Sequence, residues 1–88
     1  MEDLKEEKAK EKLKEFVGDD VFISIHGIIE LQVMYEDFNY FINKKRFLIS
    51  SKQGNEINID MGSIEKMVAN EHKVFIYMDN DQEIILEL

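Results

Sequence analysis

Cysteine, proline and tryptophan are all absent from this chain of 88 residues, and glycine occurs at only four positions. The lack of cysteine excludes disulfide bonds, thiolate zinc sites and cysteine nucleophiles, so the core alone must hold the fold, as fits a reducing compartment. No apolar run approaches the ~20 residues of a membrane-spanning helix, and the charged amino terminus is unlike a signal peptide. We therefore expect a cytoplasmic protein with no membrane contact.

Basic residues are also scarce, with 11 Lys and Arg against 19 Asp and Glu, which gives a net charge of −8 at pH 7. Such a surface repels the phosphate backbone of nucleic acids at long range and disfavours nonspecific binding to them. The chain is 44% hydrophobic, which is ordinary for a compact protein. Its length predicts one small domain.

Residues 1–17 predict a charged amphipathic helix, because Glu and Lys dominate and both favour helices. A narrow apolar stripe follows one side of this helix and must dock on the rest of the protein. Gly18 marks the end of the helix. The stripe consists of Leu4, Ala9, Leu13, Phe16 and Val17.

Residues 18–88 predict a small β domain, because apolar side chains now alternate with polar ones. Between Val21 and Tyr35 the odd positions are apolar except for Gly27. A hairpin with a three-residue connection keeps them on one face and sets Ile23 beside Leu31. A single strand sharply bent at the glycine does the same, but its length makes the hairpin the favoured prediction.

Short strands separated by polar turns predict an antiparallel meander, which hides most of its edges if it curls into a barrel. An alternative for 64–69 is a helical turn capped by Ser63. Beyond the first hairpin, the predicted strands are 40–43, 46–51, 56–60, 64–69, 74–79 and 83–88.

No motif predicts catalysis, a metal site or a cofactor. His26 and His72 are both expected to be exposed loop residues, since their spacing suggests no shared site. The Ser63-x-x-Lys66 pattern lacks partner motifs, and the acidic run 79–83 lacks the glycine of a calcium loop. A weak hydrolase at His26 or Ser63 is the least favoured alternative.

Positive charge is concentrated in one segment. Between Phe38 and Asn55 the chain carries Lys and Arg but no acid, and aromatic residues lie among them. Cations beside aromatic faces are used to bind single-stranded nucleic acid. The alternative is an ordinary solvated turn beside core aromatics. The candidate binding residues from this pattern are Lys44, Lys45, Arg46, Phe47 and Lys52.

The carboxyl-terminal segment has the opposite character, with acids at alternate positions and an apolar row of Ile84, Leu86 and Leu88. A final strand of this kind is either tucked into the barrel or paired with another subunit through a free edge. We predict self-association through this strand edge, with the basic segment as its complement in a head-to-tail ring.

The order of elements resembles the Sm-like family, whose members have an amino-terminal helix and a small, strongly bent antiparallel barrel. Residues 21–27 are similar to its first strand and turn, 29–39 to its second strand and following loop, and 64–77 to its fourth and fifth strands. The resemblance implies a small barrel and ring assembly. Asn39 is the candidate RNA ligand that it supplies, while Asn70-Glu71 replaces the family's Arg-Gly pair, so RNA binding is not carried over.

The sequence thus predicts a mainly β fold, with a helix followed by a small Sm-like or SH3-like barrel. A pleckstrin-homology-like barrel is disfavoured, because such domains close with a carboxyl-terminal helix. We expect a non-catalytic, homo-oligomeric interaction or assembly module without cofactors. The alternatives are an RNA- or single-stranded-DNA-binding barrel and the accessory subunit of an enzyme.

Overall fold

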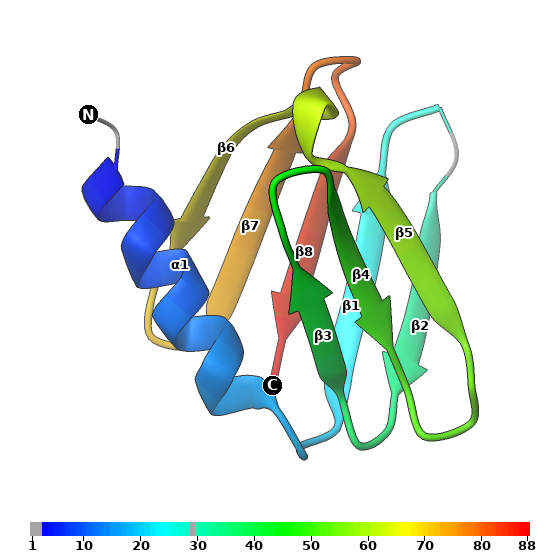
Figure 1. Ribbon diagram of the computed structural model, residues 1–88. Coiled ribbons are helices and arrows are strands. Elements are labelled where there is room, and N and C mark those ends of the chain that lie inside the picture. The colour runs from blue at the N-terminus through cyan, green and yellow to red at the C-terminus, as the bar shows by residue number, and fades with distance from the viewer. Residues whose placement is uncertain (1–2, 29) are drawn as a thin grey trace.

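A computed structural model describes residues 3–28 and 30–88 of the chain and shows one helix followed by eight strands (Figure 1). The elements are α1 (Asp3–Phe16), β1 (Val21–His26), β2 (Leu31–Tyr35), β3 (Asn39–Ile42), β4 (Arg46–Ser50), β5 (Glu56–Asp60), the 3₁₀ turn η1 (Met61–Ser63), β6 (Ile64–Ala69), β7 (Lys73–Met78) and β8 (Glu83–Glu87). Each strand predicted within 40–88 is present, with ends shifted by at most one residue.

The strands form two antiparallel sheets. One has five strands in the order β2-β1-β8-β7-β6, and the other has three in the order β3-β4-β5. The meander returns on itself, since β8 pairs with β1, but no ladder joins β2 to β3 or β5 to β6 among the described residues. The structure therefore confirms a mainly β fold with an amino-terminal helix. The closed barrel stays a prediction.

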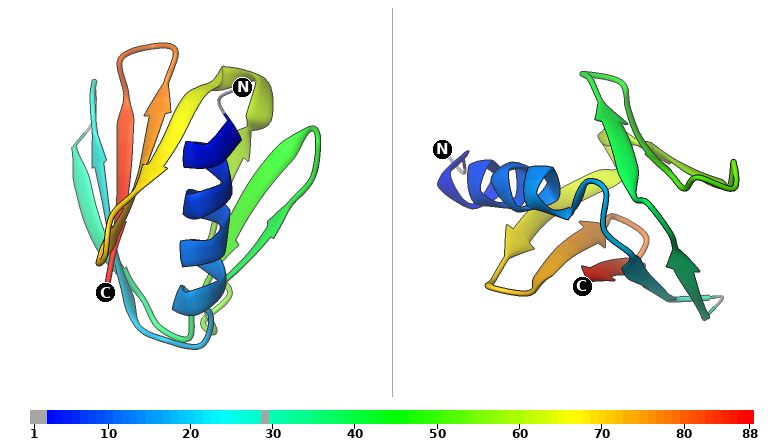
Figure 2. Two further views of the ribbon diagram at one scale, coloured as in Figure 1. Left: turned by 90° about the vertical axis from the view of Figure 1, so that its left-hand side faces the viewer. Right: turned by 90° about the horizontal axis from the view of Figure 1, so that it is seen from below.

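Helix α1 and the three-stranded sheet lie on the same side of the five-stranded sheet, as the view from below shows (Figure 2). The helix packs against β6 and β7 and buries Ala9, Leu13 and Phe16 completely. Across residues 3–28 and 30–88, no helix has the length and apolar character needed to cross a membrane.

The helix ends where Gly18 adopts a left-handed φ of 88° and its N–H donates to the carbonyl oxygen of Phe38 at 2.9 Å. Glycine takes this conformation without a steric penalty, which explains the stop. The chain turns away from the core directly after Val17, and the Val17 side chain does not pack into it. Val17 is 45% exposed, so its assignment to the apolar stripe is wrong.

One core lies between the helix and the two sheets. Aromatic rings connect the layers: Phe16 meets Phe38 edge-on with centroids 6.3 Å apart, and Phe38 stacks on Tyr40 at 6.2 Å. The strand residues fully or almost fully buried around them are Val21, Ile23, Tyr35, Phe47, Ile49, Ile59, Met67, Val74, Ile76, Ile84 and Leu86.

The β1–β2 hairpin is confirmed, but its predicted register is wrong. Ile23 pairs with Val33 and not with Leu31, because the connection is longer than three residues. Position 29 of that connection lies outside the described residues. A shift of two residues keeps each side chain on its face of the sheet, so the alternation survives the error.

The segment 64–69 is a strand, and the helical alternative applies only to the turn before it. Asp60 caps η1 by accepting a hydrogen bond from the N–H of Gly62 at 3.1 Å. Strand β6 then starts with an irregular register between Ile64 and Lys66.

Candidate interaction surface

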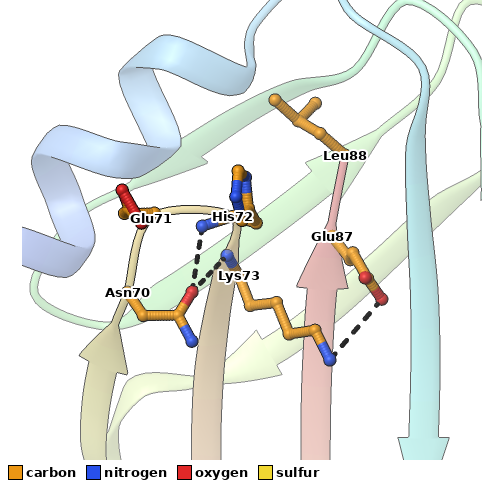
Figure 3. Close-up of a pocket in the computed structure, with 6 residues that line it drawn as sticks. All are labelled: Asn70, Glu71, His72, Lys73, Glu87 and Leu88. Atoms are coloured by element: carbon orange, nitrogen blue, oxygen red, sulfur yellow. Dashed lines mark hydrogen bonds and ion pairs between the residues drawn. The ribbon is translucent and has the colours of Figure 1, made fainter.

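A shallow surface depression lies at one end of the five-stranded sheet, beside the turn between β6 and β7 (Figure 3). Asn70 closes the turn by accepting hydrogen bonds from the N–H groups of His72 and Lys73, both at 2.9 Å. Lys73 and Glu87 pair along the sheet, with Nζ and Oε1 3.9 Å apart. The lining residues are Asn70, Glu71, His72, Lys73, Glu87 and Leu88. They include no serine, threonine or tyrosine hydroxyl.

The two histidines lie at opposite ends of the five-stranded sheet. His26 ends β1 in register with Glu83, whereas His72 lies in the β6–β7 turn beside the carboxyl end of β8. Strand β7 separates these ends by ~20 Å at ~3.3 Å per residue. His72 is exposed as predicted, but His26 is a half-buried strand residue and not a loop residue. Nowhere in the described chain do three or more His, Asp or Glu side chains gather to hold a metal ion.

The structure divides the predicted nucleic-acid segment between two ends of β4. Lys44, Lys45 and Arg46 lie at the β3–β4 turn, where the Oδ1 of Asn43 accepts from the N–H groups of Lys45 and Arg46, each at 2.8 Å. Lys52 lies beyond the other end of β4, about 20 Å away at ~3.3 Å per residue. The four cations therefore form no single patch.

Two further candidate residues, Phe47 and Asn39, are also placed unfavourably for contact with a base. Phe47 is fully buried in the core, so its role as a nucleic-acid contact is wrong. Asn39 pairs with Ser50 at the end of β4 away from the lysine turn, and its Oδ1 accepts from the N–H of Tyr40 at 2.8 Å. Arg46 lies opposite the acidic residue Asp60 in the β4–β5 ladder.

The predicted oligomer edge at β8 is wrong. Strand β8 lies inside the five-stranded sheet, between β1 and β7, so both of its edges are already hydrogen-bonded. Ile84 and Leu86 point into the core, at 6% and 0% exposure, while Leu88 follows the strand and is 55% exposed. The apolar row therefore stabilises the fold and offers no free edge.

One side of the five-stranded sheet faces away from α1 and the three-stranded sheet (Figure 2). This side carries a different group of apolar side chains. Strands β7 and β8 carry apolar side chains on both of their faces. Their inward residues belong to the buried core, whereas Phe75, Tyr77 and Ile85 lie half-buried on this second side. We call it the outer face and define its apolar part by Phe22, Met34, Val68, Phe75, Tyr77 and Ile85.

Cross-strand neighbours join the apolar residues of β6, β7 and β8 into one band, which ends at polar Ser24 on β1. Phe75 lies opposite Ile85 on β8 and opposite Val68 on β6, so an apolar band crosses three strands. Phe75 and Tyr77 also stack, with an interplanar angle of 7°. Phe22 and Met34, opposite one another at the sheet edge, are 48% and 46% exposed.

Charged side chains border this apolar band. Lys66 places its Nζ 5.1 Å from the centroid of the Tyr77 ring, a cation–π contact. Lys73 and Glu87 form the ion pair at one end of the outer face, and Glu83 lies opposite Tyr77 at the other. The outer face thus combines an apolar centre with a polar rim, the composition of protein interfaces.

The sequence carried a signal for this surface that our predictions did not use. Residues 74–78 and 84–86 are apolar at consecutive positions, whereas a strand with one wet face alternates. Consecutive apolar residues indicate a strand covered on both sides. The fold covers only one of them.

Two tyrosines facing the core give the protein a dependence on alkaline pH. Burial raises the pKa of Tyr35 above its ordinary 10.0, with a smaller contribution from the charge of Glu56, and burial also raises the pKa of Tyr40. The folded state therefore holds these protons more tightly, so its stability is complete below pH ~10 and falls as the pH rises above it. We expect the free energy of unfolding, measured with denaturant, to fall less steeply with rising pH in a Tyr35→Phe/Tyr40→Phe double variant than in the wild type. An equal slope in both proteins would contradict this.

A comparison with protein-family models gives no match, and comparisons with curated proteins and with solved structures give none either.

Proposed function

We propose that the protein is a non-catalytic assembly module that associates with copies of itself through the outer face. The observation that carries this proposal is the pair of strands β7 and β8, whose apolar side chains face both ways while the core covers one side only. Burying apolar surface yields about 25 cal/mol per Å², so a contiguous apolar patch of this kind favours association.

The outer face of the other sheet supports association less well. Its large apolar residues are Phe41, which is 55% exposed, and half-buried Leu48. Polar Asn58 lies next in that row, and the acids Glu56 and Asp60 lie on the same strand. The apolar patch there is therefore short and flanked by charge, while that of the five-stranded sheet continues across strands.

In the surface depression, the side chains of Asn70, Lys73 and Glu87 bond to the backbone or to each other, which supports a role for them in the fold. The nucleic-acid alternative rests on the absence of acids between Phe38 and Asn55, but its cations lie at opposite ends of β4. The accessory-subunit alternative has no observation that favours it over the assembly module.

We also propose that the fold is an opened small barrel of the Sm-like type. Its support is the ladder between β1 and β8, which brings the meander back to its first strand. Ladders between β2 and β3 and between β5 and β6 would be needed to close the barrel. The proposed relation to the Sm-like fold therefore rests on the order of the strands.

Light scattering tests the assembly proposal. Between micromolar and submillimolar concentration, we expect the mass of the wild-type protein to rise above the 10.4 kDa of a single chain. Phe75→Thr, which replaces the ring with a β-branched residue that favours strands, should weaken association about tenfold or more, because it removes the centre of the apolar band.

The matched control is Phe41→Thr, which removes an exposed phenylalanine from the other sheet and should leave the mass unchanged. Circular dichroism confirms that both variants are folded. A wild-type protein that remains a single chain throughout the concentration series would overturn the proposal.

A further inference from the structure

The ladder between β7 and β8 lies at the middle of the outer face and carries a regular arrangement of charge. Along it, Lys73 pairs with Glu87, Phe75 with Ile85 and Tyr77 with Glu83, and all of these side chains point to the outer face. Strand β7 therefore presents a cation and two aromatic rings, and β8 presents two carboxylates and an aliphatic side chain.

From this arrangement we infer that the occupant of the outer face is a second copy of the chain, packed face to face about a two-fold axis that runs along the strands between β7 and β8. The inference rests on the proposed function and specifies its geometry. Such an axis sets β8 of each copy over β7 of the other. Each residue then faces a partner residue at the same level along the strands. Lys73 then faces the partner's Glu87, and Phe75 faces the partner's Ile85.

Charge complementarity selects this arrangement over the other two-fold packing of the same faces. An axis across the strands would reverse the order along β8 and set Glu83 over the partner's Glu87, which places like charges together twice. The axis along the strands gives two attractive contacts between Lys73 and Glu87. It also places the apolar pair Phe75 and Ile85 at the centre, where interfaces exclude water.

A two-fold contact of this kind closes with two chains, because each copy uses the same surface. This differs from the head-to-tail ring that the sequence suggested, for which β8 offers no free edge. Two aligned sheets would be related as in a β-sandwich, with strands of the two sheets about 30° apart.

The size of the outer face predicts a weak dimer. Five strands ~4.8 Å apart and ~17 Å long cover roughly 400 Å² of each copy, about half of the ~800 Å² per partner in a standard interface. Each copy also carries a net charge of −8. Salt at ~0.15 M screens the repulsion between the two net charges beyond ~8 Å but acts less on charged pairs in contact. Dimerisation should therefore be measured at this ionic strength.

Charge reversal tests the geometry directly. In Lys73→Glu, two carboxylates face each other at each contact, and in Glu87→Lys two ammonium groups do so. Each variant alone should therefore dimerise about tenfold or more weakly than the wild type, as measured by sedimentation equilibrium. A mixture of the two should form a heterodimer as tight as the wild-type dimer, since both contacts again join opposite charges. The double variant Lys73→Glu/Glu87→Lys should also dimerise.

Matched controls come from α1, where Lys12 and Glu15 form an ion pair at 3.0 Å away from the outer face. Lys12→Glu and Glu15→Lys change the net charge by the same amounts and should leave dimerisation unchanged. Thermal unfolding of each variant separates a lost interface from a lost fold.

The outcomes distinguish the two proposals. A wild-type protein that stays monomeric overturns both and leaves the outer face to a different protein. If the wild type dimerises and Phe75→Thr prevents it, but the charge variants dimerise normally or their mixture fails to recover, the two-fold geometry is wrong and the assembly proposal stands. Recovery only in the mixture and in the double variant supports the inference.

Discussion

Phe38→Ala should lower the free energy of unfolding by about 3–5 kcal/mol, the usual range for removal of a buried phenylalanine. Phe38 is fully buried and its ring contacts both Phe16 of α1 and Tyr40 of β3. Its backbone also connects the ends of the helix and the first hairpin, since its N–H donates to Asp19 and its carbonyl accepts from Gly18, both at 2.9 Å. A cavity here would therefore loosen the helix and both sheets together.

Chemical denaturation followed by circular dichroism measures this loss. The matched control is Phe41→Ala, which truncates a phenylalanine three residues later that is 55% exposed. It should change the free energy of unfolding by less than about 1 kcal/mol. If both variants lost the same stability, Phe38 would not be the connection between helix and sheets that the structure shows.

Leu13→Ala should lower the free energy of unfolding by about 2–5 kcal/mol. Leu13 is fully buried on the side of α1 that packs against β6 and β7, and most of the helix surface around it is charged. Alanine keeps the helix propensity, so the loss reports the docking of the helix on the sheet and not its intrinsic formation. The melting temperature and the denaturation midpoint should fall together.

Val17→Ala is the corresponding control for the helix. The spacing of apolar residues placed Val17 in the same stripe as Leu13, but the chain turns at Gly18 and leaves Val17 at 45% exposure. We expect a change below about 0.5 kcal/mol. A large loss in Val17→Ala would mean that the helix continues one turn farther onto the core.

Much of this fold was predictable because local patterns determine local structure. The alternation of apolar residues from Val21 to Tyr35 identified the first hairpin, and Gly18 identified the end of α1. Alternation fixes which face a residue occupies, but a shift of two residues leaves it unchanged. Alternation therefore could not predict the register that pairs Ile23 with Val33.

Neighbour relations between distant strands were not predictable in the same way. Nothing in the local sequence of β8 states that it inserts between β1 and β7, a contact between the two ends of the chain. This position turned Ile84 and Leu86 from candidate interface residues into core residues. The nucleic-acid contact predicted at Phe47 was wrong for a related reason. Alternation along the strand indicates which face Phe47 occupies, but not whether that face is covered.

The insertion of β8 between β1 and β7 also bears on how the protein is made. A ribosome synthesises every other strand of the five-stranded sheet before β8, so until then β1 and β7 present unpaired edges in the nascent chain. Helix α1 and the β3-β4-β5 sheet need no later residue for their own hydrogen bonds. Translation therefore completes the largest sheet last, through a contact that spans most of the sequence and closes slowly.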